Sequence, residues 1–141
     1  MTIRASLWAP EWFRLAPFQV RATLQTTDTE SREYSTSIAL LALVKVEHKI
    51  AIRRVVLDSR KSLGRLHGES DLDAGTIRLV RPDLDTALHE AAHIWSGDGH
   101  TTKWANCYLT LCELYDVPST SVDKVINVVR TRRARRKAKG R

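Results

Sequence analysis

The sequence predicts one domain of the α+β class, built from a few short strands and several helices. Its 141 residues are 43% apolar and 28% charged, which is the composition of an ordinary globular domain with a single core. Short segments rich in β-branched residues lie in the middle of the chain, whereas helical spacing of apolar residues dominates the C-terminal third. Strands followed by a run of helices are typical of an α+β arrangement.

The N-terminal segment, residues 1–37, is predicted to form an aromatic stretch and a polar linker. Residues 1–20 contain four of the nine aromatic side chains, Trp8, Trp12, Phe13 and Phe18. We expect these rings to pack on the protein's own core, with docking to a partner or a membrane surface as the alternative. Residues 23–37 are rich in Thr, Ser and Glu, a composition that favours a linker or solvated loop.

The main domain is expected at residues 38–129, where apolar periodicity is strongest. A mostly buried helix is predicted over residues 36–49. Three strands follow from β-branched content and partial alternation, at residues 50–58, 63–67 and 76–80. The last two strands are joined by the turn-rich residues 68–75, in which glycines and aspartates supply turn conformations.

Three helices are predicted after the strands, at residues 83–96, 102–115 and 121–130. Pro82 and Asp83 suit the start of the first helix, and the Gly97-Asp98-Gly99 sequence suits its end. The last helix has one apolar face, made of Val122, Val125, Ile126 and Val129.

The formal net charge of +7 arises in the C-terminal tail, residues 130–141. This tail has no acidic residue and eight basic ones: Arg130, Arg132, Arg133, Arg135, Arg136, Lys137, Lys139 and Arg141. The rest of the chain carries 15 basic and 16 acidic residues, a net charge of −1. We expect a disordered tail that contacts the phosphates of DNA or RNA, with a merely solubilising tail as the alternative.

Membrane and secretory classes are not expected. The longest apolar run, residues 38–46, is interrupted by Lys45 and is too short to cross a bilayer, and the N-terminus lacks the unbroken apolar region of a signal peptide. Cys107 and Cys112 are five residues apart on one predicted helix, where they point about 140° apart and suit neither a disulfide nor a shared metal. A protein of the reducing cytoplasm is therefore expected.

An HExxH motif lies within the predicted helix 83–96, as His89-Glu90-Ala91-Ala92-His93. Two histidines four residues apart on a helix share one face and can bind one Zn²⁺ together. The apolar face of this helix consists of Leu84, Leu88, Ala91 and Trp95. Because His89 and His93 lie at about 140° and 180° from Leu84 on the helical wheel, we expect them to face a cleft; hydrogen-bonded core histidines are the alternative.

A catalytic zinc site takes three protein ligands and keeps a fourth position for water. His100 is the expected third ligand because it directly follows the Gly97-Asp98-Gly99 turn, seven residues after His93. Glu113 and Asp98 are the alternatives for this position. His48 and His67 are expected to be surface or core histidines instead.

Four stretches match a known pattern: Leu63-Gly64-Arg65, Thr76-Ile77-Arg78-Leu79, the HExxH helix from Leu88, and Gly99-His100 with Trp104 four residues later. Together they resemble the small zincin metallopeptidases of the SprT-like (Spartan-related) group. The resemblance implies a zincin-like minimal metallopeptidase domain, with a small mixed sheet packed on the HExxH helix and further C-terminal helices. It also implies that strand 76–80 borders the cleft and pairs with an extended substrate. The sequence departs from the group in the short connection from His93 to His100 and in lacking a cysteine-rich zinc ribbon.

Zinc held by His89, His93 and His100 would lower the pKa of bound water toward 7, and Glu90 is placed to accept its proton as general base. The expected reaction is hydrolysis of a peptide bond. The resemblance together with the basic tail suggests substrates associated with nucleic acid. The rival interpretation is a non-catalytic zinc-containing module that binds nucleic acid through the tail.

Two kinds of supporting contact are expected around the ligands. Trp104 is expected to pack against His100 and fix its ring. Asp98, Asn106 or Asp116 is expected to accept a hydrogen bond from the second ring nitrogen of a ligand.

Overall fold

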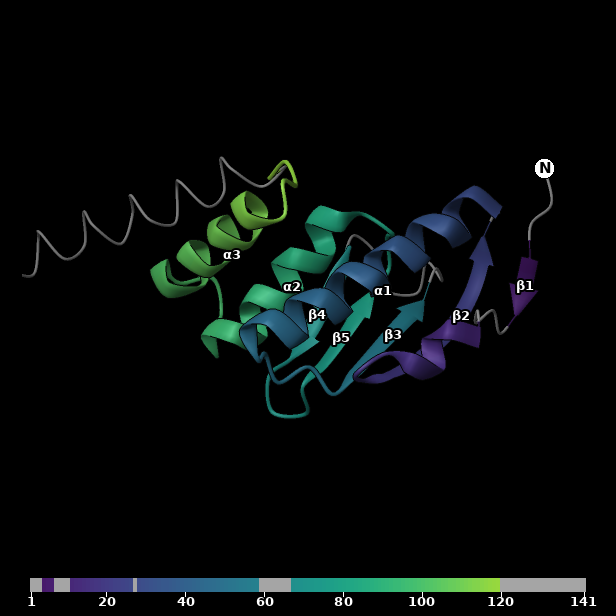
Figure 1. Ribbon diagram of the computed structural model, residues 1–141, viewed down its shortest axis with the longest axis horizontal. Helices are drawn as coiled ribbons and strands as arrows, with labels where there is room; N and C mark the ends of the chain where they lie inside the picture. Colours follow the sequence, from purple (N-terminus) through teal and green to yellow (C-terminus); the bar gives the residue numbers. More distant parts are fainter. Residues whose placement is uncertain (1–3, 7–10, 27, 59–66, 120–141) are drawn as a thin grey trace, which may run out of the picture.

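The structure of the chain is a computed structural model that describes residues 4–6, 11–26, 28–58 and 67–119 (Figure 1). Its elements in chain order are β1 (Arg4–Ser6), the 3-10 helix η1 (Glu11–Leu15), β2 (Gln19–Thr26), α1 (Asp28–His48), β3 (Arg54–Asp58), β4 (Gly68–Asp71), β5 (Thr76–Leu79), α2 (Leu84–Ser96) and α3 (Thr102–Leu114). None of the helices in these ranges combines the length and apolar character that a bilayer crossing requires.

The strands of the described residues form one mixed sheet in the order β1-β2-β3-β5-β4. Strands β2, β3 and β5 run parallel in the centre, and β1 and β4 are antiparallel to their neighbours at the two edges. A small mixed sheet packed against α2 with a further helix after it confirms the predicted α+β class.

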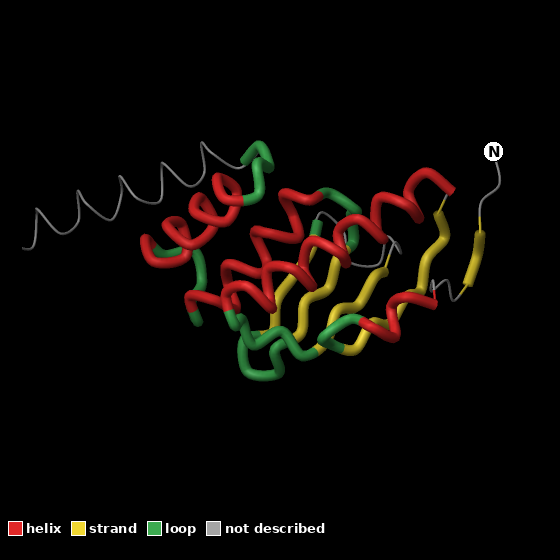
Figure 2. The backbone as a smooth tube through the Cα atoms, in the orientation of Figure 1, coloured by secondary structure: helices red, strands yellow, loops and turns green. Residues whose placement is uncertain are grey.

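Helices α1 and α2 cover one face of the sheet (Figure 2). The side chains that face them, Val55, Leu57, Ile77 and Leu79, are fully buried. Alternate residues on the same strands, such as Val56 and Arg78, are only partly buried, and among the described residues no helix packs on this second face. Because strand side chains alternate between faces, the core lies between the sheet and the helices, and no other described element covers the second face, which we call the open face.

Residues 23–26 belong to the end of β2 and residues 28–37 to the first half of α1, so the prediction of a linker is wrong for these residues. The boundary expected at residue 37 falls inside α1. Two polar side chains explain why a polar segment can pack: the Tyr34 hydroxyl donates to the Val80 carbonyl at 2.5 Å, and the Ser37 hydroxyl donates to the Pro82 carbonyl at 2.7 Å. These bonds tie α1 to the connection between β5 and α2.

Two of the three predicted strands are confirmed with shifted limits. Strand 50–58 narrows to β3, and strand 76–80 corresponds to β5. Residues 68–71, expected as turn, form β4, and the turn is confined to residues 72–75, where Gly75 adopts a positive φ of 67°. Most of the predicted strand 63–67 lies outside the described residues.

The helices of the C-terminal half agree with prediction as far as they are described. Helices α2 and α3 match the expected ranges 83–96 and 102–115 to within one residue. The predicted helix 121–130 and the basic tail lie outside the described residues. Of the N-terminal aromatic residues, Phe13 and Phe18 belong to the core, as expected, while Trp12 is 38% exposed.

Candidate metal centre

Helix α2 carries its motif histidines on the side away from the core. Leu88, Ala91 and Ala92 are fully buried. Leu84 and Trp95 are partly buried and pack against the same core. His89 and His93 are only partly buried, as the helical wheel predicted. The burial pattern therefore leaves both imidazole rings available on one face of the helix.

The turn after α2 reverses the chain and returns His100 to this face. Gly97 has a φ of 69°, and its N–H donates to the His93 carbonyl at 2.9 Å, which ends the helix. The Thr101 hydroxyl donates to an Asp98 carboxylate oxygen at 2.8 Å and accepts the N–H of Trp104 as the N-cap of α3. These bonds fix a compact turn between α2 and α3.

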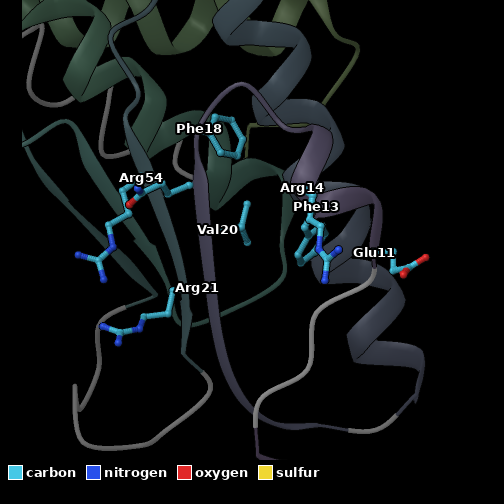
Figure 3. Close-up of a pocket in the computed structure, with 8 residues that line it drawn as sticks. Glu11, Phe13, Arg14, Phe18, Val20, Arg21 and Arg54 are labelled. Atoms are coloured by element: carbon cyan, nitrogen blue, oxygen red, sulfur yellow. The ribbon is translucent and has the colours of Figure 1, made fainter.

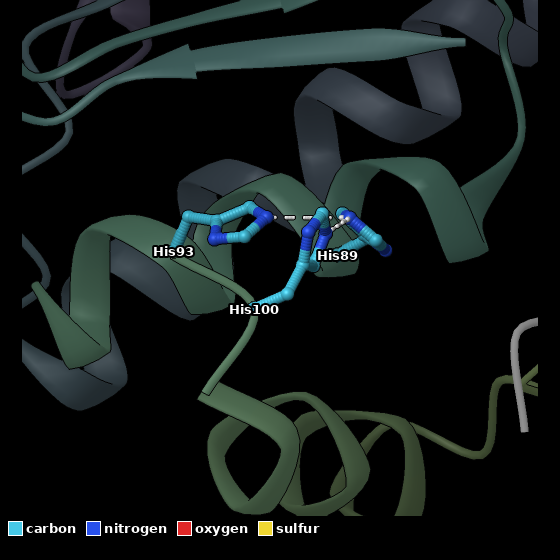
Figure 4. Close-up of side chains that lie close together, drawn as sticks. All are labelled: His89, His93 and His100. Atoms are coloured by element: carbon cyan, nitrogen blue, oxygen red, sulfur yellow. Dashed lines mark hydrogen bonds between the residues drawn. The ribbon is translucent and has the colours of Figure 1, made fainter. Parts of the chain in front are cut away.

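The three histidines converge through their Nε2 atoms (Figure 4). The Nε2 of His89 lies 3.2 Å from that of His100 and 3.3 Å from that of His93. Tetrahedral ligands at the usual Zn–N distance of about 2.0–2.1 Å are about 3.3 Å apart. The separations therefore match two edges of a zinc coordination tetrahedron, and the residues present fit this ion.

A backbone hydrogen bond sets the orientation of His93. Its Nδ1–H donates to the Asp98 carbonyl at 2.9 Å, which leaves the lone pair on Nε2 directed at the other histidines. Burial lowers the pKa of His93 below its ordinary value, against the opposing effect of this bond. A neutral imidazole is the form that binds a metal, so burial favours the form of His93 that can be a ligand, while the hydrogen bond fixes the orientation of its ring.

Trp104 forms the wall behind the cluster. Its ring stacks on His93 at 5.0 Å between centroids and meets His100 edge-on at 4.5 Å. Its indole N–H donates to the His89 carbonyl at 3.2 Å, and the side chain is 1% exposed. The predicted contact with His100 is confirmed, and the indole also contacts both other rings.

Within the described part of the chain, His89, His93 and His100 are the one group of potential ligands whose atoms all lie within 4.8 Å of one another. The alternative ligands occupy other positions: Glu113 is exposed in the last turn of α3, and the Asp98 carboxylate accepts from Thr101.

The remaining histidines and the expected acceptors are placed as follows. His67 is exposed ahead of β4, and His48 contacts the Tyr115 hydroxyl at 2.8 Å. Of the expected hydrogen-bond acceptors, Asp98 serves through its carbonyl, while Asn106 lies on the exposed side of α3 and Asp116 follows its end.

Glu90 is buried beside the edge strand β4. The Ser70 hydroxyl donates to Glu90 Oε1 at 2.9 Å and also reaches its carbonyl at 3.1 Å. Burial raises the pKa of Glu90 to about 7, although the bond from Ser70 opposes the rise. Ser70 was missed by sequence reasoning because residues 68–75 read as a turn; their pairing with β5 gives no local signal.

The close approach of β4 to α2 depends on Gly68. A Cβ at this position would lie 2.9 Å from the Arg78 carbonyl oxygen and 3.2 Å from Glu90 Cγ. Such contacts are too short for a side chain, so only glycine lets the strand lie this near the helix.

Strand β5 is not free to pair with a substrate, contrary to the expectation for residues 76–80. Both of its edges are occupied, by β3 on one side and β4 on the other. The strand at this end of the described sheet is β4. An extended peptide bound beside Glu90 would therefore add to β4.

Comparisons with protein-family models, with curated proteins and with solved structures found no match to this chain. The site is consequently defined by its own geometry: three imidazole nitrogens at the spacing of zinc ligands, and a buried carboxylate one residue after the first of them.

Proposed function

We propose that the protein is a zinc-dependent metallopeptidase with His89, His93 and His100 as zinc ligands and Glu90 as general base. The observation that carries this proposal is the spacing of 3.2 and 3.3 Å between the ligand nitrogens. Histidines that only form hydrogen bonds in a core have no reason to direct three ring nitrogens at one point. Ligands of a shared metal ion must direct their donor atoms in this way.

Zinc bound here supplies a Lewis acid that polarises a peptide carbonyl and lowers the pKa of water toward 7. Glu90 takes the proton of the attacking water and delivers it to the departing amine. In the metal-free protein, burial raises the pKa of the Glu90 carboxyl to about 7. Ser70 holds one carboxylate oxygen through its hydroxyl.

The substrate is proposed to lie along β4 as an added antiparallel or parallel strand. Main-chain hydrogen bonds to an edge strand recognise any extended polypeptide without strong dependence on its side chains. Proteins bound to nucleic acid are the proposed substrates, on the basis of the eight basic residues at 130–141, which lie outside the described residues.

The test combines metal analysis with a peptidase assay on an unfolded protein substrate. Wild-type protein is expected to bind one zinc ion and to cleave. Glu90→Gln is expected to keep the zinc and lose about 10²- to 10⁴-fold in turnover, the usual contribution of general acid–base catalysis. His100→Ala is expected to lose zinc.

Glu113→Gln is the matched control, because it makes the same chemical change at an exposed glutamate on α3. It is expected to retain both zinc and activity. If Glu113→Gln lost zinc and His100→Ala retained it, the third zinc ligand would be Glu113 instead of His100. A zinc-loaded wild type without any cleavage would favour the non-catalytic module instead.

A further inference from the structure

The open face of the sheet presents a row of arginines. On this face Arg21 of β2 is in register with Val56 of β3, and Val56 is in register with Arg78 of β5. Arg54 lies two residues from Val56 on β3 and therefore points to the same side. The strands thus hold three arginines around one apolar residue.

The spacing of these arginines follows from sheet geometry. Neighbouring strands are about 4.8 Å apart and two residues rise about 6.6 Å, so Arg21 and Arg54 start about 8 Å from each other. Figure 3 shows their side chains extending in the same direction from β2 and β3. Two guanidinium groups held this way can each contact a phosphate of the same polyanion.

Two of the three cations have no acidic partner among the described residues. Arg78 pairs with Glu69 of β4 at 3.5 Å, whereas Arg21 and Arg54 form no ion pair with a described side chain. A pocket of about 720 Å³ lies beside β2, and its lining includes Arg21 and Arg54 of the open face together with residues of η1 and of the core side of β2. Positive charge therefore gathers at the β2–β3 side of the sheet.

We propose that this open face is a docking surface for the backbone of a nucleic acid, with Arg21 and Arg54 as its principal phosphate contacts. Charge complementarity selects this occupant, because closely spaced guanidinium groups that have no acidic partner among the described residues fit the regular charge of a phosphodiester chain. The surface lies on the opposite face of the sheet from the helices that cover the core, α2 among them (Figure 2). A nucleic acid held here leaves the histidine cluster uncovered. The inference does not depend on zinc or on peptidase activity.

The test measures binding of a fluorescein-labelled DNA duplex to the full-length chain over a range of salt concentrations. Each phosphate contact contributes about 0.9 to the slope of log affinity against log salt. Arg21→Ala and Arg54→Ala are each expected to reduce that slope by about 1 and to weaken binding roughly 8-fold at 0.1 M salt. Glu69→Gln releases Arg78 from its ion pair and is expected to strengthen binding.

Arg32→Ala is the matched control, because Arg32 is exposed on α1, on the other side of the sheet. It is expected to change neither the slope nor the affinity. Unchanged binding in Arg21→Ala, an exposed position where folding is not at risk, would overturn the proposal. So would an equal loss in Arg32→Ala, or displacement of the DNA by polyglutamate with equal potency per charge, which would assign the face to acidic polypeptides.

Discussion

Replacing Glu90 by glutamine is expected to stabilise the metal-free protein at neutral and alkaline pH. Glu90 is 4% exposed, and burial raises its pKa from 4.5 to about 7. The folded chain therefore keeps a proton that the unfolded chain loses above pH 4.5. Glutamine has nearly the same shape, needs no proton to be neutral, and can still accept the hydrogen bond from Ser70.

The magnitude follows from the interval between the two pKa values. A folded-state pKa raised above the unfolded value means that stability is highest below pH 4.5 and falls until about pH 7. Each pH unit in this interval costs 1.36 kcal/mol of unfolding free energy, so the full loss is about 3 kcal/mol. The glutamine variant escapes this loss, and above pH 7 its melting temperature is expected to exceed that of the wild type by roughly 10 °C.

The assay is urea denaturation of both proteins in the presence of a chelator at several pH values between 4 and 8. The difference in unfolding free energy between the two proteins reports the contribution of the Glu90 carboxyl alone, because the two proteins share every other titrating group. Glu113→Gln, which makes the same chemical change at an exposed site on α3, is measured alongside as the control. A difference between wild type and Glu90→Gln that stays constant from pH 4 to 8 would refute the reasoning.

Three further predictions concern the packing around α2. Ser70→Ala is expected to raise the pKa of Glu90 above about 7 in the metal-free protein, since the lost hydrogen bond opposed that rise; a carboxyl resonance titrated by NMR checks this, and an unchanged midpoint would contradict it. Gly68→Ala forces β4 away from the helix and is expected to cost about 1–3 kcal/mol in thermal unfolding, whereas an unaltered melting temperature would count against the tight approach. Tyr34→Phe leaves the Val80 carbonyl without its donor and is expected to lower the unfolding free energy by about 1–3 kcal/mol; full stability in urea would show that this bond does not hold α1 in place.

The candidate site was largely predictable because its signals are local. The histidine spacing, the Gly97-Asp98-Gly99 turn and His100 all lie within one short stretch, and each residue acts through the geometry of its own helix or turn. The same is true of the limits of α2 and α3, which agree with the expected glycine stop and with the start expected at residue 102. Helix periodicity and turn preferences were sufficient wherever a residue's structure depends on its neighbours in the sequence.

The parts that sequence reasoning missed depend on partners distant in the chain. The polar first half of α1 packs because Tyr34 and Ser37 find backbone carbonyls 46 and 45 residues away. Residues 68–71 become a strand because they pair with β5 and because Gly68 fits against α2. Strand β5 lies inside the sheet because it pairs with both β3 and β4. The order of the strands cannot be predicted from the sequence of one segment.

The sequence separation of the proposed zinc ligands bears on the order of folding. His89 and His100 are eleven positions apart, so bringing their rings together closes only a short loop, and the entropy lost is small. The contacts that attach α1 to the β5–α2 connection close loops about four times as long. If the protein binds zinc as proposed, α2 and the turn to His100 can capture the ion while the sheet is still unpaired, and the ion would then act as a nucleus for the slower strand pairing.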